Sequence, residues 1–447
     1  MCWKLQDFTY FCTTLHHTKF KKHIFSIMKG THKHYKWEVL ALLWMAYLLN
    51  QADRQVFNTV LPQVRDHFGI GDTEVGWIGT IFNLCYALMV PLGGMAGDRL
   101  SRKWVVTIAI LFWSVATMFT GLASGVVMLI LLRSIATGGG EAFFGPANYS
   151  LLGQYHTDTR ARAMSIHQTS YYVGVVLAGV LAGYIAEKLG WQYSFIIFGA
   201  AGVVWGIVMA LRLKDKKEEI AGQAGSDIPS AVEESKPGIL DGFKIVFTTP
   251  TALILTIGFS GFIFVITGYM TWVPTFLQEE FNMSVANAGL HSMLWTYIAA
   301  FAGVLLAGTL SDKMAVRNRK VRMDIQGLGL ILGALFLFFV KADATIWIVY
   351  ACFAGWGFFR AFFDANIYTV LYDVTPSKLH ASCSSALITT GFAVGALAPV
   401  VLGAMKESMG SLSATFPVLG GVWIVCGLMM LWASRKFYQK DYDKINR

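Results

Sequence analysis

The chain has 447 residues, of which 55% are hydrophobic and only 14% are charged, and its mean hydropathy is +0.53. Soluble domains carry about 25% charged residues, so this composition excludes a water-soluble globular protein and indicates a membrane protein. The net charge of +9 would suggest a nucleic-acid partner only if the basic residues formed a surface patch, and their positions along the chain do not support one.

Residues 1–36 precede the first apolar stretch and form a polar, basic N-terminal tail. The tail has no long apolar core and no small-residue cleavage site, so we do not expect a secretory signal. Met28 is followed by lysines and then by an apolar helix, as in an ordinary cytoplasmic leader. We therefore regard Met28 as a second candidate for the first residue.

Twelve apolar stretches follow, each close to the 20 or so residues that cross a bilayer. The first six lie near residues 38–62, 74–96, 104–122, 126–152, 164–187 and 192–211, and the second six near 249–277, 286–309, 323–341, 344–370, 381–405 and 412–434. The segment between the two sets is rich in Lys, Glu, Ser and Gly, which is typical of a flexible linker. The sequence predicts an N-terminal six-helix bundle (37–212), a cytoplasmic linker (213–243), a C-terminal six-helix bundle (244–436) and a cytoplasmic tail (437–447).

The basic residues are distributed unequally between the two ends of the predicted helices. One side, which includes both termini and the linker, carries 29 Lys and Arg, whereas the other side carries four. The positive-inside rule then predicts that the termini and the linker are cytoplasmic. The basic excess is therefore a topology signal, and we expect no nucleic-acid partner.

The two halves repeat one another. Residues 94–99 after the second predicted helix are echoed by residues 308–313 after the eighth, and an Ala-Phe-Phe triplet starts at Ala142 and again at Ala361. Repeats of this size are typical of secondary transporters that move one bundle against the other around a central site. Pro62 and Pro274 are each expected to end the first helix of their half.

Residues 94–103 read Gly-Met-Ala-Gly-Asp-Arg-Leu-Ser-Arg-Lys. This run resembles the loop motif of the major facilitator superfamily and departs from it only at Ser101, where that family has Gly. The resemblance covers residues 36–436 and implies the major facilitator fold, an all-α membrane protein with twelve transmembrane helices in two pseudo-symmetric bundles. It also implies a cytoplasmic gate latch; the alternative is that these charges only fix topology. The predicted gate residues are Gly94, Asp98, Arg99, Arg102 and Lys103, with Asp312 and Lys313 in the second half.

Within that superfamily, residues 50–55 and the stretch from Arg133 to Glu141 resemble the anion/cation symporter and spinster-like branches. Members of these branches carry sugar acids, sialic acid, other carboxylates or lysolipids, often with protons. The spacing from Arg133 to Glu141 is eight residues where those branches have seven. Glu141 therefore matches the family pattern more securely than Arg133 does.

Charged residues within the predicted spans support the same region independently. An ionisable side chain at the centre of a membrane helix costs about 3 kcal/mol on insertion scales, so its presence suggests a functional role. There are six: Asp53, Arg54, Arg133, Glu141, Arg360 and Asp364. Asn50, Arg54 and Asn58 follow one another at intervals of four, with Asp53 beside them, and form one polar stripe that we expect to face a cavity.

Alignment of the two Ala-Phe-Phe triplets places Arg360 opposite Glu141 in the partner helix. We predict that Arg54 and Arg360 bind a substrate carboxylate or phosphate and that Asp53 and Glu141 carry the coupling proton. Alternatively, Arg360 pairs with Asp364 within its helix, and Asp53 is a fixed partner of a nearby arginine. Further substrate contacts are expected from Asn50, Asn58, Tyr86 and Tyr269, and no role is assigned to Arg133 or Asp364.

The chain contains no nucleotide-binding loop and no clustered metal ligands, so we expect no enzymatic activity and no cofactor. The driving force is then an ion gradient or the substrate's own gradient, and we predict a proton gradient. The predicted function is proton-coupled symport of a small organic anion, such as a sugar acid or sialic acid, in the cell membrane. The alternatives are a spinster-like lysolipid or sugar-phosphate carrier and, in another class, a non-transporting membrane sensor. Apart from the substrate and the lipid bilayer, no obligate protein partner is implied.

Overall fold

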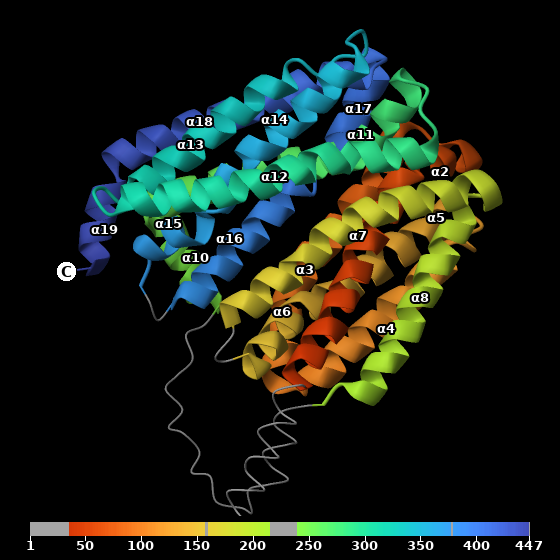
Figure 1. The fold of residues 1–447 in the computed structure, drawn as a ribbon, viewed down its shortest axis with the longest axis horizontal. Helices are drawn as coiled ribbons and strands as arrows, with labels where there is room; N and C mark the ends of the chain where they lie inside the picture. Colours follow the sequence, from red (N-terminus) through yellow and green to blue (C-terminus); the bar gives the residue numbers. More distant parts are fainter. Residues whose placement is uncertain (1–34, 157–159, 215–238, 377–378, 447) are drawn as a thin grey trace, which may run out of the picture.

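The computed structural model describes residues 35–156, 160–214, 239–376 and 379–446, and within these ranges the secondary structure is helical with no strand. The tail before residue 35 and the segment 215–238, which fall within the predicted N-terminal tail and linker, lie outside the described residues. Figure 1 shows two helical bundles side by side, the earlier one in red to yellow-green and the later one in green to blue.

The N-terminal bundle contains six membrane-spanning stretches. A helix over residues 35–59 is followed by α2 (Leu61–Phe68), α3 (Asp72–Arg99), α4 (Arg102–Thr120), the continuous segment α5 (Val126–Leu129), η1 (Ile130–Thr137) and α6 (Gly138–Tyr155), then α7 (Arg160–Leu189) and α8 (Trp191–Arg212). The segment η1 is a π-helix inside an otherwise α-helical span. Pro62 stands in the first turn of α2, where its missing N–H leaves no carbonyl unpaired.

The C-terminal bundle repeats this plan. Its helices are α10 (Ile239–Thr248), α11 (Pro250–Glu280), α12 (Val285–Ala315), α13 (Val321–Leu337), α14 (Ile346–Asp364) with α15 (Ile367–Asp373), α16 (His380–Gly395) with α17 (Ala398–Met409), the short η3 (Leu412–Ala414), α18 (Thr415–Lys436) and α19 (Tyr438–Asn446). α10 starts inside the segment that we predicted as linker, and α19 is a helix within the predicted tail. Pro274 lies inside α11, which continues to Glu280, so the prediction that it ends this helix is wrong. Prolines are tolerated inside membrane helices because neighbouring groups satisfy the freed carbonyl.

Ten helical segments among the described residues are long and apolar enough to cross a membrane. The helix over residues 35–59, which carries the polar stripe, and the 17-residue α13 complete the twelve spans. The predicted fold, two six-helix bundles, is thus confirmed.

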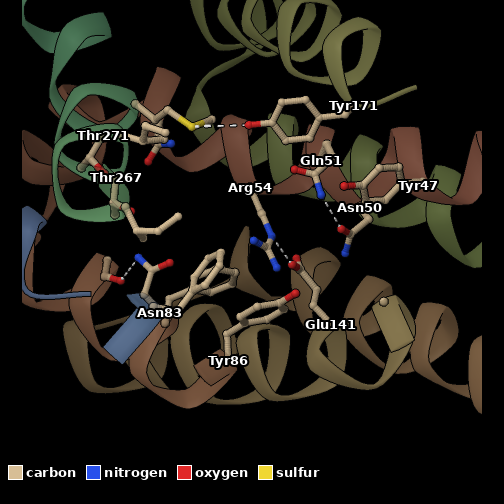
Figure 2. Close-up of a pocket in the computed structure, with 18 of the residues that line it drawn as sticks. Tyr47, Asn50, Gln51, Arg54, Asn83, Tyr86, Glu141, Tyr171, Thr267 and Thr271 are labelled. Carbon is tan, nitrogen blue, oxygen red and sulfur yellow. Dashed lines mark hydrogen bonds and ion pairs between the residues drawn. The ribbon is translucent and has the colours of Figure 1, made fainter. Parts of the chain in front are cut away.

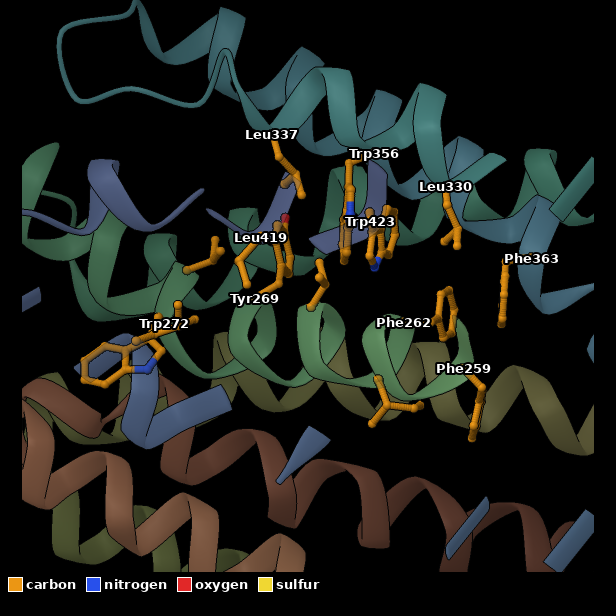
Figure 3. Close-up of a cluster of buried hydrophobic side chains, with 14 of the residues drawn as sticks. Phe259, Phe262, Tyr269, Trp272, Leu330, Leu337, Trp356, Phe363, Leu419 and Trp423 are labelled. Atoms are coloured by element: carbon orange, nitrogen blue, oxygen red, sulfur yellow. The ribbon is translucent and has the colours of Figure 1, made fainter. Parts of the chain in front are cut away.

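An aromatic core between α11, α14 and α18 stabilises the C-terminal bundle (Figure 3). The Trp356 ring stacks on Tyr269 at a centroid distance of 4.1 Å and on Trp423 at 5.4 Å, and Phe262 stacks on Phe363 at 4.5 Å. Burial of large rings contributes most of the packing energy of such a core. It fixes α11, α14 and α18 relative to one another, and therefore fixes the side chains that α11 and α14 direct toward the other bundle.

The two bundles contact each other closely along α7 and α12. A Cβ atom added to Gly179 would lie 2.4 Å from the carbonyl oxygen of Gly289, and one added to Gly183 would lie 2.5 Å from the Cα of Ala286. Only glycine allows the two backbones to approach so closely. The same end of the molecule carries α2 and the start of α3, so the bundles are closed together there.

Four charged side chains join the bundles at this closed end, and we call them the charge quartet: Arg65, Asp72, Glu279 and Lys406. Arg65 lies 2.9 Å from Asp72 and 2.7 Å from Glu279, and Lys406 lies 2.9 Å from Asp72 and 2.7 Å from Glu279. Each bundle contributes one cation and one anion, so the quartet is neutral and both cations bridge the interface.

Candidate functional site

A cavity of about 610 Å³ lies between the two bundles. Its walls come from the helix over residues 35–59, α3, η1, α6 and α7 on one side and from α11, α12, α14, α15 and α16 on the other. Figure 2 shows side chains from both bundles pointing into this space. Of the six charged residues that the sequence places within the spans, five line this cavity: Arg54, Arg133, Glu141, Arg360 and Asp364.

Arg54 and Glu141 form the closest ion pair in the cavity. Arg54 Nε donates a hydrogen bond of 2.6 Å to Oε2 of Glu141, and the arginine guanidinium lies 4.2 Å from the centre of the Tyr86 ring (Figure 2). Glu141 is buried, and its Oε1 has no hydrogen-bond partner. Arg54 is therefore the one hydrogen-bond donor to this carboxylate among the described residues, and the second oxygen is buried without a donor.

Asp53 points away from this cavity. Its Oδ2 accepts a 2.7 Å hydrogen bond from the Thr117 hydroxyl of α4, and its Oδ1 is buried without a partner. The polar stripe predicted on the first helix thus divides: Asn50, Arg54 and Asn58 line the cavity, whereas Asp53 faces the interior of the N-terminal bundle. Position i+3 on this helix is rotated far enough from the i, i+4, i+8 row to leave the cavity face.

Arg133 also lines the cavity, although its spacing to Glu141 exceeds the family pattern by one residue. The π-helix η1 accounts for this, because it contains Arg133 and its i+5 hydrogen bonds take up one additional residue per turn. Arg133 Nη2 donates to the carbonyl of Arg54 at 3.3 Å, and the guanidinium lies 4.4 Å from the Phe82 ring. Its Nε and Nη1 are buried without hydrogen-bond partners, so the guanidinium carries two unsatisfied donors.

Arg360 and Asp364 lie on the opposite wall, at the end of α14. Arg360 Nε is 3.5 Å from Asp364 Oδ2, which is an ion pair but too long for a strong hydrogen bond. Arg360 is buried, its Nε has no hydrogen-bond partner, and its guanidinium lies 5.4 Å from the Tyr297 ring. Glu141 and Arg360, which the alignment of the two Ala-Phe-Phe triplets placed opposite each other, thus line the same cavity.

Of the other predicted substrate contacts, Asn50, Asn58 and Tyr86 line the cavity and Tyr269 does not. The Tyr269 ring is stacked in the aromatic core, and its hydroxyl lies 3.0 Å from the carbonyl of Ser292 and 2.7 Å from the Thr296 hydroxyl of α12. Its neighbours Met270 and Thr271 face the cavity instead, which is a difference of one or two positions on the same helix.

The predicted gate residues lie at the end of the bundles opposite the charge quartet. Arg102 Nε donates to the carbonyl of Gly97 at 3.1 Å and so ties the start of α4 to the end of α3. Lys103 lies over the Trp104 ring, and Gly94 stands where an added Cβ would meet nothing within 4 Å. Ser101 has a φ of −62°, which suits any residue, so its replacement of glycine causes no strain.

The side chains of the predicted gate residues Asp98 and Arg99 lie outside those that the structure describes. In the second half, Asp312 accepts from Arg322 Nη2 at 3.3 Å, and Lys313 stands in the last turn of α12. Arg322 also lies 3.5 Å from Asp373, so Asp312 belongs to a small ionic network at this end.

Several cavity residues escaped the sequence analysis. Their side chains are uncharged and polar, and within an apolar span such residues resemble ordinary packing or interfacial groups. They are Tyr47, Gln51, Tyr149 and Gln168 from the N-terminal bundle and Thr267 and Thr271 from α11. For two of them the sequence did hold a signal. Tyr47 and Gln51 are four residues apart, as are Asn50 and Arg54, so the two pairs lie on adjoining faces of the first helix.

Twelve spans in two halves, with a charged cavity between them and a closed end, define a secondary membrane transporter. The chain matches the Major Facilitator Superfamily over residues 43–399 and belongs to that family, which consists of transporters rather than enzymes and needs no cofactor. Within the described part of the chain, no group of three or more His, Cys, Asp and Glu side chains is placed to hold a metal ion.

The chain is similar to a hexuronate transporter of Bacillus subtilis, with 24% identity over 89% of this chain and 94% of the relative. It is also similar to a D-galactonate transporter of Escherichia coli O6:H1, with 25% identity over 83% of this chain and 89% of the relative. Among solved structures, a bacterial homologue of the human lysosomal transporter Spinster, in an inward-facing and unoccupied conformation, superposes with a TM-score of 0.70 at 21% identity, covering 92% of this chain and 98% of the other.

Proposed function

We propose that the protein is a proton-coupled symporter of a small organic anion, such as a sugar acid, sialic acid or a similar carboxylate. The observation that carries the proposal is the ion pair of the partly buried Arg54 with the buried Glu141, joined at 2.6 Å in the wall of the central cavity. The similar hexuronate and galactonate transporters support the same class of substrate.

The proposed coupling follows from competition for one guanidinium. While Glu141 is ionised it occupies Arg54, and an anion entering the cavity would be repelled by the carboxylate. A proton on Glu141 removes that charge and weakens the pair, so the planar donor fork of Arg54 becomes available to a carboxylate. Arg133, with two unused buried donors, adds a second cation beside it.

Asp53 is proposed as a second proton carrier. It is buried, and its single hydrogen bond comes from Thr117, so a proton on its partnerless Oδ1 would relieve the cost of an unpaired buried charge. Because Asp53 faces away from the cavity but interacts with Glu141 and Arg133, it would act on these two residues and not by touching substrate.

The test is uptake into proteoliposomes with an imposed pH gradient, using hexuronates, aldonates, sialic acid and lysolipids as the panel. We expect a carboxylate to accumulate in the wild type and its uptake to be lost in Arg54→Ala. Glu141→Gln should bind the anion but no longer respond to the pH gradient. Proton-driven accumulation that survives Glu141→Gln would remove Glu141 from the coupling mechanism.

A spinster-like carrier of lysolipids is the second candidate, because one feature favours it. A groove of about 560 Å³ with an almost wholly apolar lining runs between α7 and α12 on the outside of the bundles. Tyr172 lines both this groove and the central cavity, and Tyr171 and Tyr297 join across the boundary at 3.0 Å. Lysolipid uptake in the panel above, with no carboxylate uptake, would favour this candidate.

We further propose that the ends of the helices bearing the gate residues are cytoplasmic, that both termini lie on that side, and that the protein resides in the cell membrane. The distribution of 29 against four Lys and Arg supports this orientation. The charge quartet would then close the external end. Labelling of cysteines introduced at the exposed Leu122 and Val316, at opposite ends, with an impermeant thiol reagent in intact cells tests it: only the former should react.

A further inference from the structure

The two walls of the central cavity differ in chemistry. The N-terminal bundle presents most of the amides, phenols and charged groups, together with Phe57, Phe82 and Phe144. The wall from α11 is largely apolar and consists of Phe259, Phe262, Ile263, Ile266 and Met270, with the hydroxyls of Thr267 and Thr271 as its polar groups. A polyhydroxylated substrate would lose hydration against this wall without gaining enough hydrogen-bond partners, whereas a hydrocarbon body would release water from it.

Arg360 of α14 gives the C-terminal side of the cavity a cation that could bind an anionic group. Its distance of 3.5 Å to Asp364 exceeds the 2.7–2.9 Å or so of a strong charge-assisted hydrogen bond, and its Nε has no hydrogen-bond partner. Arg54 and Arg133 belong to the other bundle. The cavity therefore has guanidinium groups on both bundles and an apolar wall on α11.

We propose that the transported anion is an organic diacid with an apolar body. One acid group binds to Arg54 and Arg133 in the N-terminal bundle, the second binds to Arg360 in the C-terminal bundle, and the hydrocarbon body lies against the α11 wall. This inference rests on the proposed function: it keeps the proton-coupled symporter of an organic anion and replaces the sugar acids given there as examples by an apolar diacid.

A diacid bound in this way contacts both bundles at once. Its binding energy is then available to draw the bundles together, whereas a monoacid held by Arg54 and Arg133 has no charged group for Arg360 and assists that step less. The second acid group should consequently influence transport as well as affinity.

Four six-carbon acids test the two features separately: adipate (apolar diacid), hexanoate (apolar monoacid), galactarate (polyhydroxy diacid) and galactonate (polyhydroxy monoacid). Binding is measured at neutral pH by the shift in melting temperature of the purified full-length protein, so passive entry of hexanoate into liposomes does not interfere. We expect adipate to bind at least tenfold more tightly than each of the other three. Tighter binding of galactonate or galactarate than of adipate would overturn the apolar body, and equal binding of adipate and hexanoate would overturn the second acid site.

Two variants locate the features in the cavity. Arg360→Gln should lower adipate binding to the level of hexanoate while leaving hexanoate binding unchanged, and an equal loss for both acids would contradict the assignment. Ile266→Gln adds a hydrogen-bonding group to the α11 wall and should weaken adipate but not galactarate. Because the wild-type comparison needs no variant, the proposal is tested even if either variant fails to fold.

The proposed function and this inference fail in different ways. If galactonate accumulates under a pH gradient and adipate does not, the symporter stands and the diacid proposal is refuted. If none of the four acids binds, the diacid proposal is also refuted. If acids bind but none accumulates with the pH gradient, the proton-coupled function itself is refuted.

Discussion

Arg54 has two kinds of neighbour, a carboxylate that neutralises its charge and an aromatic ring that supports its flat face. The Glu141 oxygen lies 2.6 Å from Nε and the Tyr86 ring centre 4.2 Å from the guanidinium. Arg54 and Glu141 can be recognised in the sequence because charge and an i, i+4 row are visible in the one-dimensional pattern, whereas Tyr86 was expected only as a polar side chain of the second predicted helix. Sequence reasoning misjudged Tyr269, whose environment depends on the rotation of α11 against α14, which no local pattern records.

The stacking partner of Arg54 can be tested directly. Tyr86→Leu removes the ring, and we expect it to weaken anion binding roughly two- to thirtyfold, the range that corresponds to a cation–π contact of about 0.5–2 kcal/mol. Tyr86→Phe is the matched control, since it keeps the ring and should remain near wild type. Affinities measured by titration calorimetry decide the matter; equal losses in the two variants would assign the effect to the hydroxyl group.

Among the helices, the span formed by α5, η1 and α6 departs most from regular geometry. The π-helix covers Ile130–Thr137, the Thr137 hydroxyl donates to the carbonyl of Leu132 at 2.9 Å, and three glycines follow. The positions of the spans were predictable because hydrophobic runs fix them. The π-helix was not, because it is stabilised by packing of η1 against α3 and α4 and leaves only an eight-residue spacing in the sequence.

If the π-helix compensates for one extra residue, removing one residue should be tolerated there. Deletion of Ile135, whose side chain is exposed on the outer surface, gives Arg133 and Glu141 a spacing of seven, which keeps both on one face of a regular α-helix. We expect the deletion to retain at least about a third of wild-type uptake.

Deletion of Phe112 from the regular helix α4 is the control. It rotates every later residue by about 100° relative to the earlier part of the helix, and we expect it to abolish uptake. Loss of uptake in both deletions, with normal amounts of protein in the membrane, would contradict the interpretation of η1.

The whole molecule is held in one arrangement by contacts at the end that carries the charge quartet. Besides the quartet, Gln278 donates to the carbonyl of Thr59 at 3.0 Å, and the Thr73 hydroxyl bonds to Glu407 across the interface. Charges on both sides of an interface can be seen in a sequence, but their pairing across more than two hundred residues cannot be. The quartet was therefore recognised in the sequence only as part of the charge distribution.

Opening of this end requires the bridges of the quartet to break. Glu279→Gln removes the Arg65–Glu279 bridge, which crosses the interface. Since a partly buried pair contributes up to about 1 kcal/mol, the open population should rise by up to about fivefold. Spin labels at Leu122 and Met409, measured by double electron–electron resonance, should report a larger fraction of long distances. Asp66→Asn is the control, because Asp66 pairs with Arg65 within one bundle, and it should leave the distribution unchanged.

The central claim is that entry of the anion and protonation of the Arg54–Glu141 pair are linked. It is tested most directly by adding anion to proteoliposomes that contain a pH-sensitive dye, with no gradient imposed, and recording proton movement. We predict acidification of the vesicle lumen in step with uptake of the anion, and its absence in Glu141→Gln and in Arg54→Ala. Uptake of the anion at the wild-type rate with no accompanying proton movement would contradict the account.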